Sequence, residues 1–355
     1  MLRTTLFLLL ATLCLGDNTD TRDHNFNLID PFIGSYNGGN VFTGATLPFG
    51  MAKAVADVSG QNYGGFGNDF SNVTGFSALH DSGTGGQPSM GNFPISVQPS
   101  CAGDTLEGCQ FGSKYDRAVN YRNGTPKAQP GYFSLGLENG VDVEMTTTQH
   151  AALYSFHFAG NSSNPLFLLD LTDLADSRQN ASISVDPETG RMRGNGTFLP
   201  SFGVSSYQSY FCLDFKGSNV RDTGVWVNKR GGTEPKELFV NRGYSLFYIQ
   251  AGGLVRFQKP SSGRIQARMG VSFLSTEQAC KSAEQEIPDW DFGRIKSEAQ
   301  NAWKTQMSNV SIEAGGASEG LQKTFFSGIY RTMISPQNYT GENPLWSSGE
   351  PYFDR

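Results

Sequence analysis

The sequence has no second long apolar run. After the uncharged stretch from Leu6 to Leu15, no segment approaches the roughly 20 residues that a membrane-spanning helix needs. Arg3 precedes that stretch and the small residue Gly16 follows it, which is the pattern of a secretory signal peptide cleaved before Asp17. The sequence therefore predicts a signal peptide at residues 1–16 and a secreted, extracellular protein that is not membrane-bound after cleavage.

Runs of like charge are also missing, because no five or six consecutive residues carry the same sign. Loss of Arg3 with the signal peptide changes the formal net charge from −6 to −7. A mildly acidic chain without basic clusters argues against nucleic acid as a partner. It also has no charged tail for electrostatic binding. We expect its partners to be neutral or small.

Cysteine is scarce. Cys14 leaves with the signal peptide, and the residues that remain are Cys101, Cys109, Cys212 and Cys280. In an oxidising compartment this even set predicts two disulfides, for which three pairings exist. The short separation favours a bond between Cys101 and Cys109, which leaves Cys212 for Cys280. No CxxC spacing occurs and no histidine lies near, so we expect no zinc site.

Histidine is equally scarce, and the chain contains only His24, His80, His150 and His157. His150 and His157 are an odd number of residues apart, so on one regular strand they face opposite ways and cannot share a metal ion. His80-Asp81-Ser82 has the residue types of a hydrolytic triad, but neighbours in sequence cannot adopt its geometry. Acidic residues are numerous, yet no spacing selects the pair that glycoside hydrolysis needs.

Sequons for N-glycosylation are frequent, and an acceptor asparagine must lie on the surface to be used. The predicted acceptors are Asn72, Asn123, Asn161, Asn180, Asn195, Asn309 and Asn338. Asn161, Asn180 and Asn195 bracket successive strand-like segments, so we expect them in loops. The mature chain should be a glycoprotein.

Alternation of apolar and polar residues predicts a mainly β protein. It is clearest from Val141 to Thr148 and from Ile265 to Phe273, and Leu166 to Leu169 is apolar on both faces like a covered central strand. Further strands are expected at 206–215 and 244–249. Many short strands with Gly-rich turns and no helices between them predict an antiparallel β-sandwich at residues 17–274.

Helical periodicity begins at Ser275, where a capping box with Gln278 is expected, and Pro288 ends the first helix. A second helix is predicted from Phe292 to Trp303, before Val310 and Ile312 return to a strand-like pattern. A third begins near Ser318. Its wide apolar set, which needs partners to cover it, is Leu321, Phe325, Phe326, Ile329, Tyr330 and Met333. These signals predict a helical linker at 275–316 and the start of another domain at 317–355.

The segment from Asn62 to Pro94 is loop-like and dense in glycine, aromatic, amide and hydroxyl groups. Aromatic rings stack on the C–H face of a pyranose, and fixed donors and acceptors read its hydroxyl groups. A long glycine-rich loop packed by its own aromatic side chains has the same composition, so both interpretations stay open. Gly83-Thr84-Gly85-Gly86 does not predict phosphate binding, because no lysine follows.

Seven motifs occur in an order that resembles glycoside hydrolase family 92, the exo-acting α-mannosidases, in its N-terminal part and its fungal branch. The motifs are DPFIG (Asp30 to Gly34), GATLPFGM (Gly44 to Met51), GFSALHDSGTGG (Gly75 to Gly86), PGYFS (Pro130 to Ser134), SFLSTEQA (Ser272 to Ala279), EIPDWDF (Glu286 to Phe292) and IYRTMISP (Ile329 to Pro336). They extend over nearly the whole mature chain.

The resemblance implies an N-terminal β-sandwich joined by helices to an (α/α)6 barrel, with the active site between the two domains. It implies an inverting reaction on α-mannoside glycans, in which a Glu acid, a carboxylate base and a calcium ion all belong to the barrel. Residues 317–355 would then start a truncated barrel. No catalytic residue is expected before Arg355, and no metal or calcium ligand is expected in this chain; the missing barrel of the same gene product would supply them.

The resemblance also implies a substrate rim on the sandwich, formed by Asn62, Tyr63, Phe76, His80, Asp81 and Ser82. The family commonly reads GFSHxH in this motif. Here Ala78 replaces the first histidine, and only His80 remains.

Three functions are compatible with these signals. The first is a substrate-shaping domain of a secreted α-mannosidase that acts on N-glycans or mannoproteins and is inactive without its barrel. The second is a free-standing, lectin-like carbohydrate-binding glycoprotein. The third is an inactive partner that covers another chain's barrel. An apolar stripe on the third helix argues against a chain that stands alone.

Overall fold

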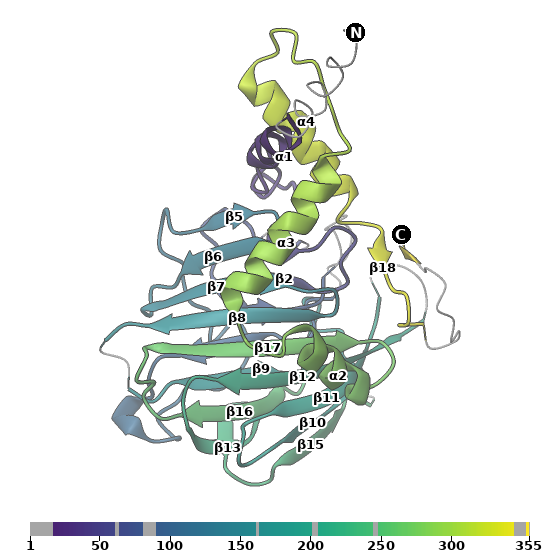
Figure 1. The fold of residues 1–355 in the computed structure, drawn as a ribbon. Coiled ribbons are helices and arrows are strands. Elements are labelled where there is room, and N and C mark those ends of the chain that lie inside the picture. The colour runs from purple at the N-terminus through teal and green to yellow at the C-terminus, as the bar shows by residue number, and fades with distance from the viewer. Residues whose placement is uncertain are drawn as a thin grey trace, which may run out of the picture.

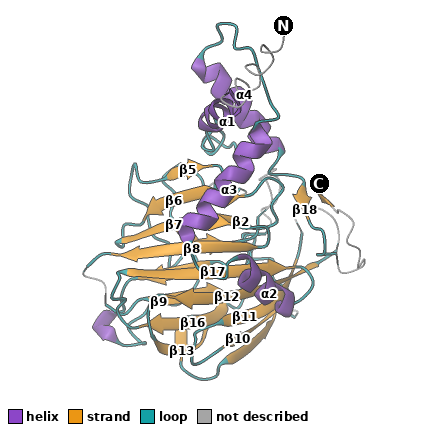
Figure 2. Ribbon diagram, in the orientation of Figure 1, coloured by secondary structure: helices purple, strands orange, loops and turns teal. Residues whose placement is uncertain are grey.

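The computed structural model describes residues 17–60, 64–80, 90–160, 163–200, 205–243, 248–343 and 353–354. Two antiparallel sheets lie face to face, with helices on one of them and at one end (Figures 1 and 2). The eight-stranded sheet has the order β1 (Ala45–Thr46), β2 (Lys53–Val58), β3 (Val73–Ser77), β4 (Ile95–Gln98), β9 (Leu166–Asp170), β16 (Ala251–Phe257), β13 (Val220–Val227) and β14 (Arg230–Gly232). The predicted β-sandwich is confirmed.

The second sheet has nine strands in the order β15 (Glu237–Asn241), β10 (Asn180–Val185), β11 (Met192–Phe198), β12 (Tyr207–Lys216), β17 (Arg264–Ser272), β8 (Ala151–Phe158), β7 (Val141–Thr147), β6 (Tyr132–Gly136) and β5 (Lys127–Gln129). A separate short pair joins β18 (Gln337–Asn338) to β19 (Phe353–Asp354). The strands predicted at 141–148, 206–215 and 265–273 correspond to β7, β12 and β17.

The space between the sheets is the main core. Val141, Val143 and Met145 of β7 alternate into it and are completely buried. Strand β9 is buried along its whole length, as its continuous apolar run predicts. Its outer side chains Leu166 and Leu168 form a smaller apolar cluster with Trp226 and with the Cys101–Cys109 disulfide. Each such side chain stabilises the fold by roughly 1.5–3 kcal/mol through burial.

Helix α2 (Thr276–Glu286) lies on the outer face of the nine-stranded sheet. Ser275 caps its N-terminus by accepting a hydrogen bond from the backbone N–H of Gln278. The return half of the predicted capping box is wrong, because the Gln278 amide donates instead to Gly341 O and to Glu342. A disulfide joins Cys280 to Cys212 of β12, so both predicted disulfide pairings are confirmed.

The remaining helices gather at one end of the sandwich (Figure 1). Helix α3 (Phe292–Met307) crosses β6 and β7 and contacts α1 (Asp17–Asn27). Residues 308–318 connect α3 to α4 (Glu319–Thr332). Trp303 of α3 is completely buried; its indole donates to Thr46 O at 2.6 Å, and its ring lies 4.5 Å from that of Tyr330 on α4. The end of α3 therefore links the helices to the sandwich.

Several local expectations were wrong. Residues 17–27, assigned to the sandwich, form a helix that packs on α3, since Asn25 donates to the carbonyl groups of Met307 and Val310. No strand forms at Val310 or Ile312. In the predicted strand at 244–249, residues 248 and 249 are not in a strand, and 244–247 lie outside the described residues.

The loop placement of two sequons was also wrong. Asn180 begins β10 and Asn195 lies within β11, where it pairs with Ser182. Both asparagines face outward on half-buried positions, because polar residues alternate with buried ones along each strand. Asn161 lies outside the described residues.

Candidate functional site

His80 lies three residues beyond the end of β3 and is completely buried. Its Nε2 is 2.7 Å from Asp57 Oδ1 of β2 and 2.8 Å from Ser77 Oγ of β3. Asp57 and Ser77 face the same side of the sheet because Asp57 pairs with Gly75, two residues before Ser77. These three side chains form one polar group, the His80 cluster.

Two atoms of the His80 cluster have no hydrogen-bond partner among the described residues, namely Nδ1 of His80 and Oδ2 of Asp57. A buried polar atom without a partner costs about 1–3 kcal/mol, so each such atom needs a functional or structural explanation. His80 is followed directly by the motif residues Asp81 and Ser82. Among the described residues, His80 is thus a buried histidine whose Nδ1 has no hydrogen-bond partner, and it directly precedes Asp81 and Ser82.

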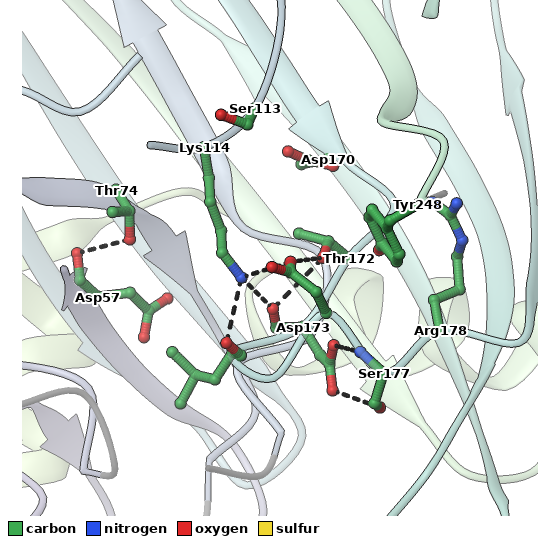
Figure 3. Close-up of polar contacts among 12 residues, drawn as sticks. Asp57, Thr74, Ser113, Lys114, Asp170, Thr172, Asp173, Ser177, Arg178 and Tyr248 are labelled. Atoms are coloured by element: carbon green, nitrogen blue, oxygen red, sulfur yellow. Dashed lines mark hydrogen bonds and ion pairs between the residues drawn. The ribbon is translucent and has the colours of Figure 1, made fainter. Parts of the chain in front are cut away.

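A second polar group, the Lys114 cluster, lies in the turn after β9 (Figure 3). The Lys114 ammonium is 2.9 Å from Asp176 Oδ1 and donates to the backbone carbonyls of Asp173 and Leu174. The Asp173 carboxylate accepts hydrogen bonds from the N–H and hydroxyl of Ser177, both at 2.7 Å. One buried lysine therefore fixes the turn that leaves the central strand.

Two arginines, Arg117 and Arg178, extend this network at the end of β9. Arg117 lies 2.5 Å from Asp170 Oδ2, and its guanidinium stacks 4.6 Å above the Trp226 ring. Arg178 lies 4.4 Å above the Tyr248 ring and donates to Leu171 O. Stacking on an aromatic face and a carboxylate partner together satisfy a guanidinium that is removed from water.

Burial changes the proton affinity of the acidic groups here. It raises the pKa of the Asp170 carboxyl, against the opposing charge of Arg117, and that of the Asp173 carboxyl, against the hydrogen bonds from Ser177. Burial also lowers the pKa of Lys114, but the hydrogen bond to Asp176 and the charges of Asp176, Tyr115 and Asp173 together outweigh it, and the net shift is upward. Each of these groups has a charged or hydroxyl partner within the chain, which is typical of a structural network.

The two clusters lie near each other at one end of the eight-stranded sheet. The pairing of Phe76 of β3 with Ile95 of β4 brings Ser77 beside Pro94, whose carbonyl accepts the N–H of Asp170 at the end of β9. Gly91 fits between the clusters with a φ of 64°. A Cβ at this position would lie 2.5 Å from Leu174 Cγ and 3.3 Å from His80 Cε1, so only glycine is accommodated.

Of the six predicted rim residues, the structure describes Phe76 and His80, and both are buried. Phe76 is 1% exposed and makes edge contacts with Tyr154 and Phe156 in the core, so its expected contact with sugar is wrong. His80 is buried beneath the surface rather than displayed on it. Asn62, Tyr63, Asp81 and Ser82 lie outside the described residues.

Asp57, Ser77 and Lys114 were not predicted as site residues. The sequence does contain a signal for Asp57, because it interrupts the otherwise apolar run Ala54 to Val58, and a charged residue in a fully buried strand needs a partner. Lys114 lies in a polar stretch from which no pattern distinguishes it. Two other histidines also have carboxylate partners: His150 contacts Glu286, and His157 contacts Glu144.

Comparison with known proteins identifies the family. Residues 28–272 match the model of the glycosyl hydrolase family 92 N-terminal domain, and residues 278–355 match that of the family 92 catalytic domain. This chain belongs to glycoside hydrolase family 92. The family predicted from the motifs is confirmed. The match to the catalytic-domain model begins at residue 278, within the predicted helical linker at 275–316 and before the predicted domain start at 317.

A family 92 relative from Arthroderma benhamiae, described as an uncharacterized secreted glycosidase, is 55% identical over 336 residues. The match covers 92% of this chain and 43% of that protein, so the chain spans less than half the length of this relative. Among the described residues, no helix is long and apolar enough to cross a membrane.

Solved structures of family 92 enzymes share the fold. The glycosyl hydrolase ccman5 superposes with a TM-score of 0.79 at 21% identity, covering 93% of this chain and 45% of that protein. The α-mannosidase BT3965 from Bacteroides thetaiotaomicron, in its complex with mannoimidazole, gives a TM-score of 0.73 at 19% identity and covers 93% and 44%. At these identities the comparison supports the sandwich and helix arrangement alone.

Proposed function

We propose that this chain is the N-terminal, substrate-shaping and carbohydrate-binding part of a secreted exo-α-mannosidase that hydrolyses α-mannosides of N-glycans or mannoproteins with inversion. The observation that carries the proposal is that one chain matches both family 92 domain models and is 55% identical to a secreted glycosidase. The mannoimidazole complex of BT3965 supports a mannoside as the substrate class.

The catalytic acid and base are proposed to lie beyond Arg355. Inverting hydrolysis needs two carboxyl groups about 6.5–9.5 Å apart, with room for a water molecule between one of them and the sugar. Asp170 instead pairs with Arg117. The Asp173 carboxylate accepts two hydrogen bonds from Ser177 (Figure 3). Neither is available for substrate while those contacts persist.

Calcium, the metal that the family resemblance implies, does not fit the described residues. It takes six to eight oxygen ligands, usually including several carboxylates. No group of three or more His, Cys, Asp or Glu side chains in the described part of the chain could hold a metal ion. We propose that calcium is bound by the same domain as the acid and base, and we derive no step through it here.

The exposed face of α4 supports a role beside a second domain. Phe326 and Tyr330 are buried against this chain, whereas Leu321 is 61% and Phe325 43% exposed. The stripe predicted to need partners is thus half covered by the chain itself. The exposed half is an apolar surface of the kind that packs on further protein.

The His80 cluster is proposed to position the substrate motif. Asp57 and Ser77 hold the imidazole Nε2 at the point where the chain enters Asp81 and Ser82. Loss of that anchor should displace the following residues without contact between His80 and the mannoside. His80 would then be a positioning residue, and its substitution should lower kcat/KM.

The proposal is tested by mannose release from 4-nitrophenyl α-mannoside and from α-mannobiose. Residues 17–355 should release none, whereas a chimera continued past Arg355 with the Arthroderma sequence should be active. In that chimera His80→Ala should lower kcat/KM by about tenfold or more, and His157→Ala, a change at a partly exposed histidine, should not. Clear turnover by residues 17–355 alone would overturn the assignment, and tight mannoside binding without any turnover in the chimera would favour the lectin-like alternative.

A further inference from the structure

A hollow of about 420 Å³ lies on the surface away from the His80 cluster. Its lining combines aromatic rings with amide side chains and consists of Phe32, Tyr36, Asn68, Phe70, Tyr121, Asn123, Gly124 and Pro126. Phe70 precedes the start of β3, whereas His80 follows its end, so the two sites are at opposite ends of that strand. We call this the Phe70 hollow.

Phe70 is held in an exposed position by its own backbone. Its φ is 63°, a left-handed conformation that is unusual for a bulky residue, and the Tyr121 hydroxyl accepts a hydrogen bond from its N–H at 2.8 Å. The ring stacks on that of Tyr121 with centroids 6.2 Å apart and planes 12° apart. Even so, 66% of Phe70 remains exposed, and neighbouring Tyr36 is 57% exposed.

An exposed ring that its backbone holds in place offers a surface on which a ligand can pack. Backbone strain of this kind costs of order 1–3 kcal/mol and persists where the surroundings enforce it, commonly at a ligand-binding position. Phe70 faces solvent with its flat apolar side, and the amides of Asn68 and Asn123 line the same hollow. A pyranose fits this chemistry, because its C–H face packs on an aromatic ring while its polar substituents meet the amides.

The chain itself can supply that sugar at Asn123. Asn123-Gly124-Thr125 is a sequon in a tight turn, closed by the hydrogen bond from Thr125 N to Arg122 O at 3.2 Å, with Gly124 at a φ of 71°. Asn123 is exposed and is itself part of the lining. Asn195, by contrast, lies on a strand, and its amide donates to Ser182 Oγ.

We propose that Asn123 carries an N-linked oligosaccharide whose first N-acetylglucosamine occupies the Phe70 hollow and stacks on the Phe70 ring. In this modification the Asn123 amide nitrogen loses a proton and forms a bond to C1 of the sugar. The bond from C1 to the diphosphate of the lipid-linked oligosaccharide donor breaks, and the lipid diphosphate leaves. The proposal rests on secretion of the chain and is independent of mannosidase activity.

Asn72 is the natural control. It is an exposed sequon asparagine only two residues after Phe70, but it does not line the hollow. Thr74 of that sequon is buried and donates to Asp57 O, which anchors the segment to the sheet. A glycan on Asn72 therefore has no built contact with Phe70 in this structure.

The test uses residues 1–355 secreted from yeast, with glycopeptide mass spectrometry and thermal unfolding. We expect the Asn123 peptide to carry the glycan mass, and Asn123→Gln to lower Tm by about 2 °C or more. Phe70→Ala should lower Tm in the glycosylated protein, and most of that difference should vanish in the Asn123→Gln background. Such non-additivity measures the contact between sugar and ring.

Each other outcome would overturn the proposal. If mass spectrometry finds the Asn123 peptide unmodified, no glycan from Asn123 occupies the hollow. Additive effects of Phe70→Ala and Asn123→Gln show that the glycan is present but does not contact the ring. Coupling of Phe70→Ala with Asn72→Gln instead assigns the ring to the neighbouring glycan. None of these results depends on whether the chain or its chimera releases mannose.

Discussion

The central strands of the sandwich and helix α4 differ in how completely they bury their own apolar surface. In the sandwich, strands such as β9 and β16 have no exposed residue, because each sheet covers the other and the outer faces carry α2 or a disulfide-bonded loop. In the helical end, α4 buries Phe326 and Tyr330 but leaves Leu321 and Phe325 exposed. The central strands are covered on both faces, whereas α4 has an open side.

The difference shows that the two regions are stabilised in different ways. A sheet pair closes by pairing strands that are distant in sequence, so its core is complete once the strands are in register. The helices depend on a few anchoring contacts, chiefly Trp303 against Thr46 and Tyr330. We expect the helical end to respond to single substitutions at those anchors and to tolerate changes on its open side.

The largest effect is expected for Trp303→Ala. The indole fills a buried site between α3, α4 and β1, and its removal leaves a cavity as well as an unpaired Thr46 carbonyl. We expect a loss of about 5 kcal/mol in the free energy of unfolding, from the cavity and the lost hydrogen bond together. Urea unfolding followed by tryptophan fluorescence and circular dichroism measures it.

Leu321→Ala on the exposed face of α4 is the matched control, expected within about 0.5 kcal/mol of the wild type. Equal losses in the two variants would remove the distinction between anchor and open side.

A somewhat smaller effect is expected from the disulfides, and the two bonds should differ. The Cys212–Cys280 bond spans a sequence separation of 68 residues and ties α2 to β12, whereas Cys101–Cys109 spans 8 residues. Loop-closure entropy then predicts a loss of about 4 kcal/mol for the Cys212→Ser/Cys280→Ser pair and about 2.5 kcal/mol for Cys101→Ser/Cys109→Ser. Chemical unfolding of the two double variants tests the order, and the reverse order would contradict it.

The smallest effect concerns pH at the contact between His150 and Glu286, whose side chains are 2.6 Å apart. Burial lowers the pKa of His150, but the Glu286 carboxylate outweighs it, and the net shift is upward. Burial raises the pKa of Glu286, but hydrogen bonds from His150 and Thr148 outweigh it, and the net shift is downward. A raised histidine pKa stabilises the fold fully below about 6.5, the unfolded value, and less as pH rises through the folded value.

The lowered Glu286 pKa stabilises the fold above its unfolded value of 4.5 and less as pH falls. The denaturation midpoint should therefore be higher at pH 5.5 than at pH 8, and this difference should be larger in the wild type than in His150→Gln. His157→Gln is the control, because its side chain and that of Glu144 are more exposed. An unchanged difference between the two pH values in His150→Gln would show that the contact does not contribute.

Several elements were predictable because their signal is local. Strand β7 follows from alternation alone, α3 from helical spacing, and α2 from Ser275, whose hydroxyl accepts the N–H of Gln278. The pairing of Cys101 with Cys109 follows from short separation. Helix α1 was not predictable in the same way, because its polar sequence has no apolar stripe and its contacts are made with α3, some 280 residues later.

The candidate site shows the same limit. The GFSALHDSGTGG motif could be recognised as a family signature, but the motif gives no indication that Phe76 faces the core while His80 turns back to meet Asp57. Strand register decides the first, because Phe76 and its neighbour Ser77 face opposite sides of the sheet. His80 lies beyond the end of β3 and meets Ser77 and Asp57 through a tertiary contact. The DPFIG and IYRTMISP motifs meet in space, where Arg331 donates to the carbonyls of Pro31 and Ile33.

By itself, the sequence determined the family, the β-sandwich, the Cys101–Cys109 disulfide and the start of the helices that follow the sandwich, since each depends on residue types at short spacing or on motif order. The tertiary structure alone decided which polar residues share the His80 and Lys114 clusters, which half of α4 is covered, and that Phe70 and Asn123 line one hollow. Those features depend on contacts between segments far apart in the chain, and such contacts are set by strand register and by packing, which local patterns do not record.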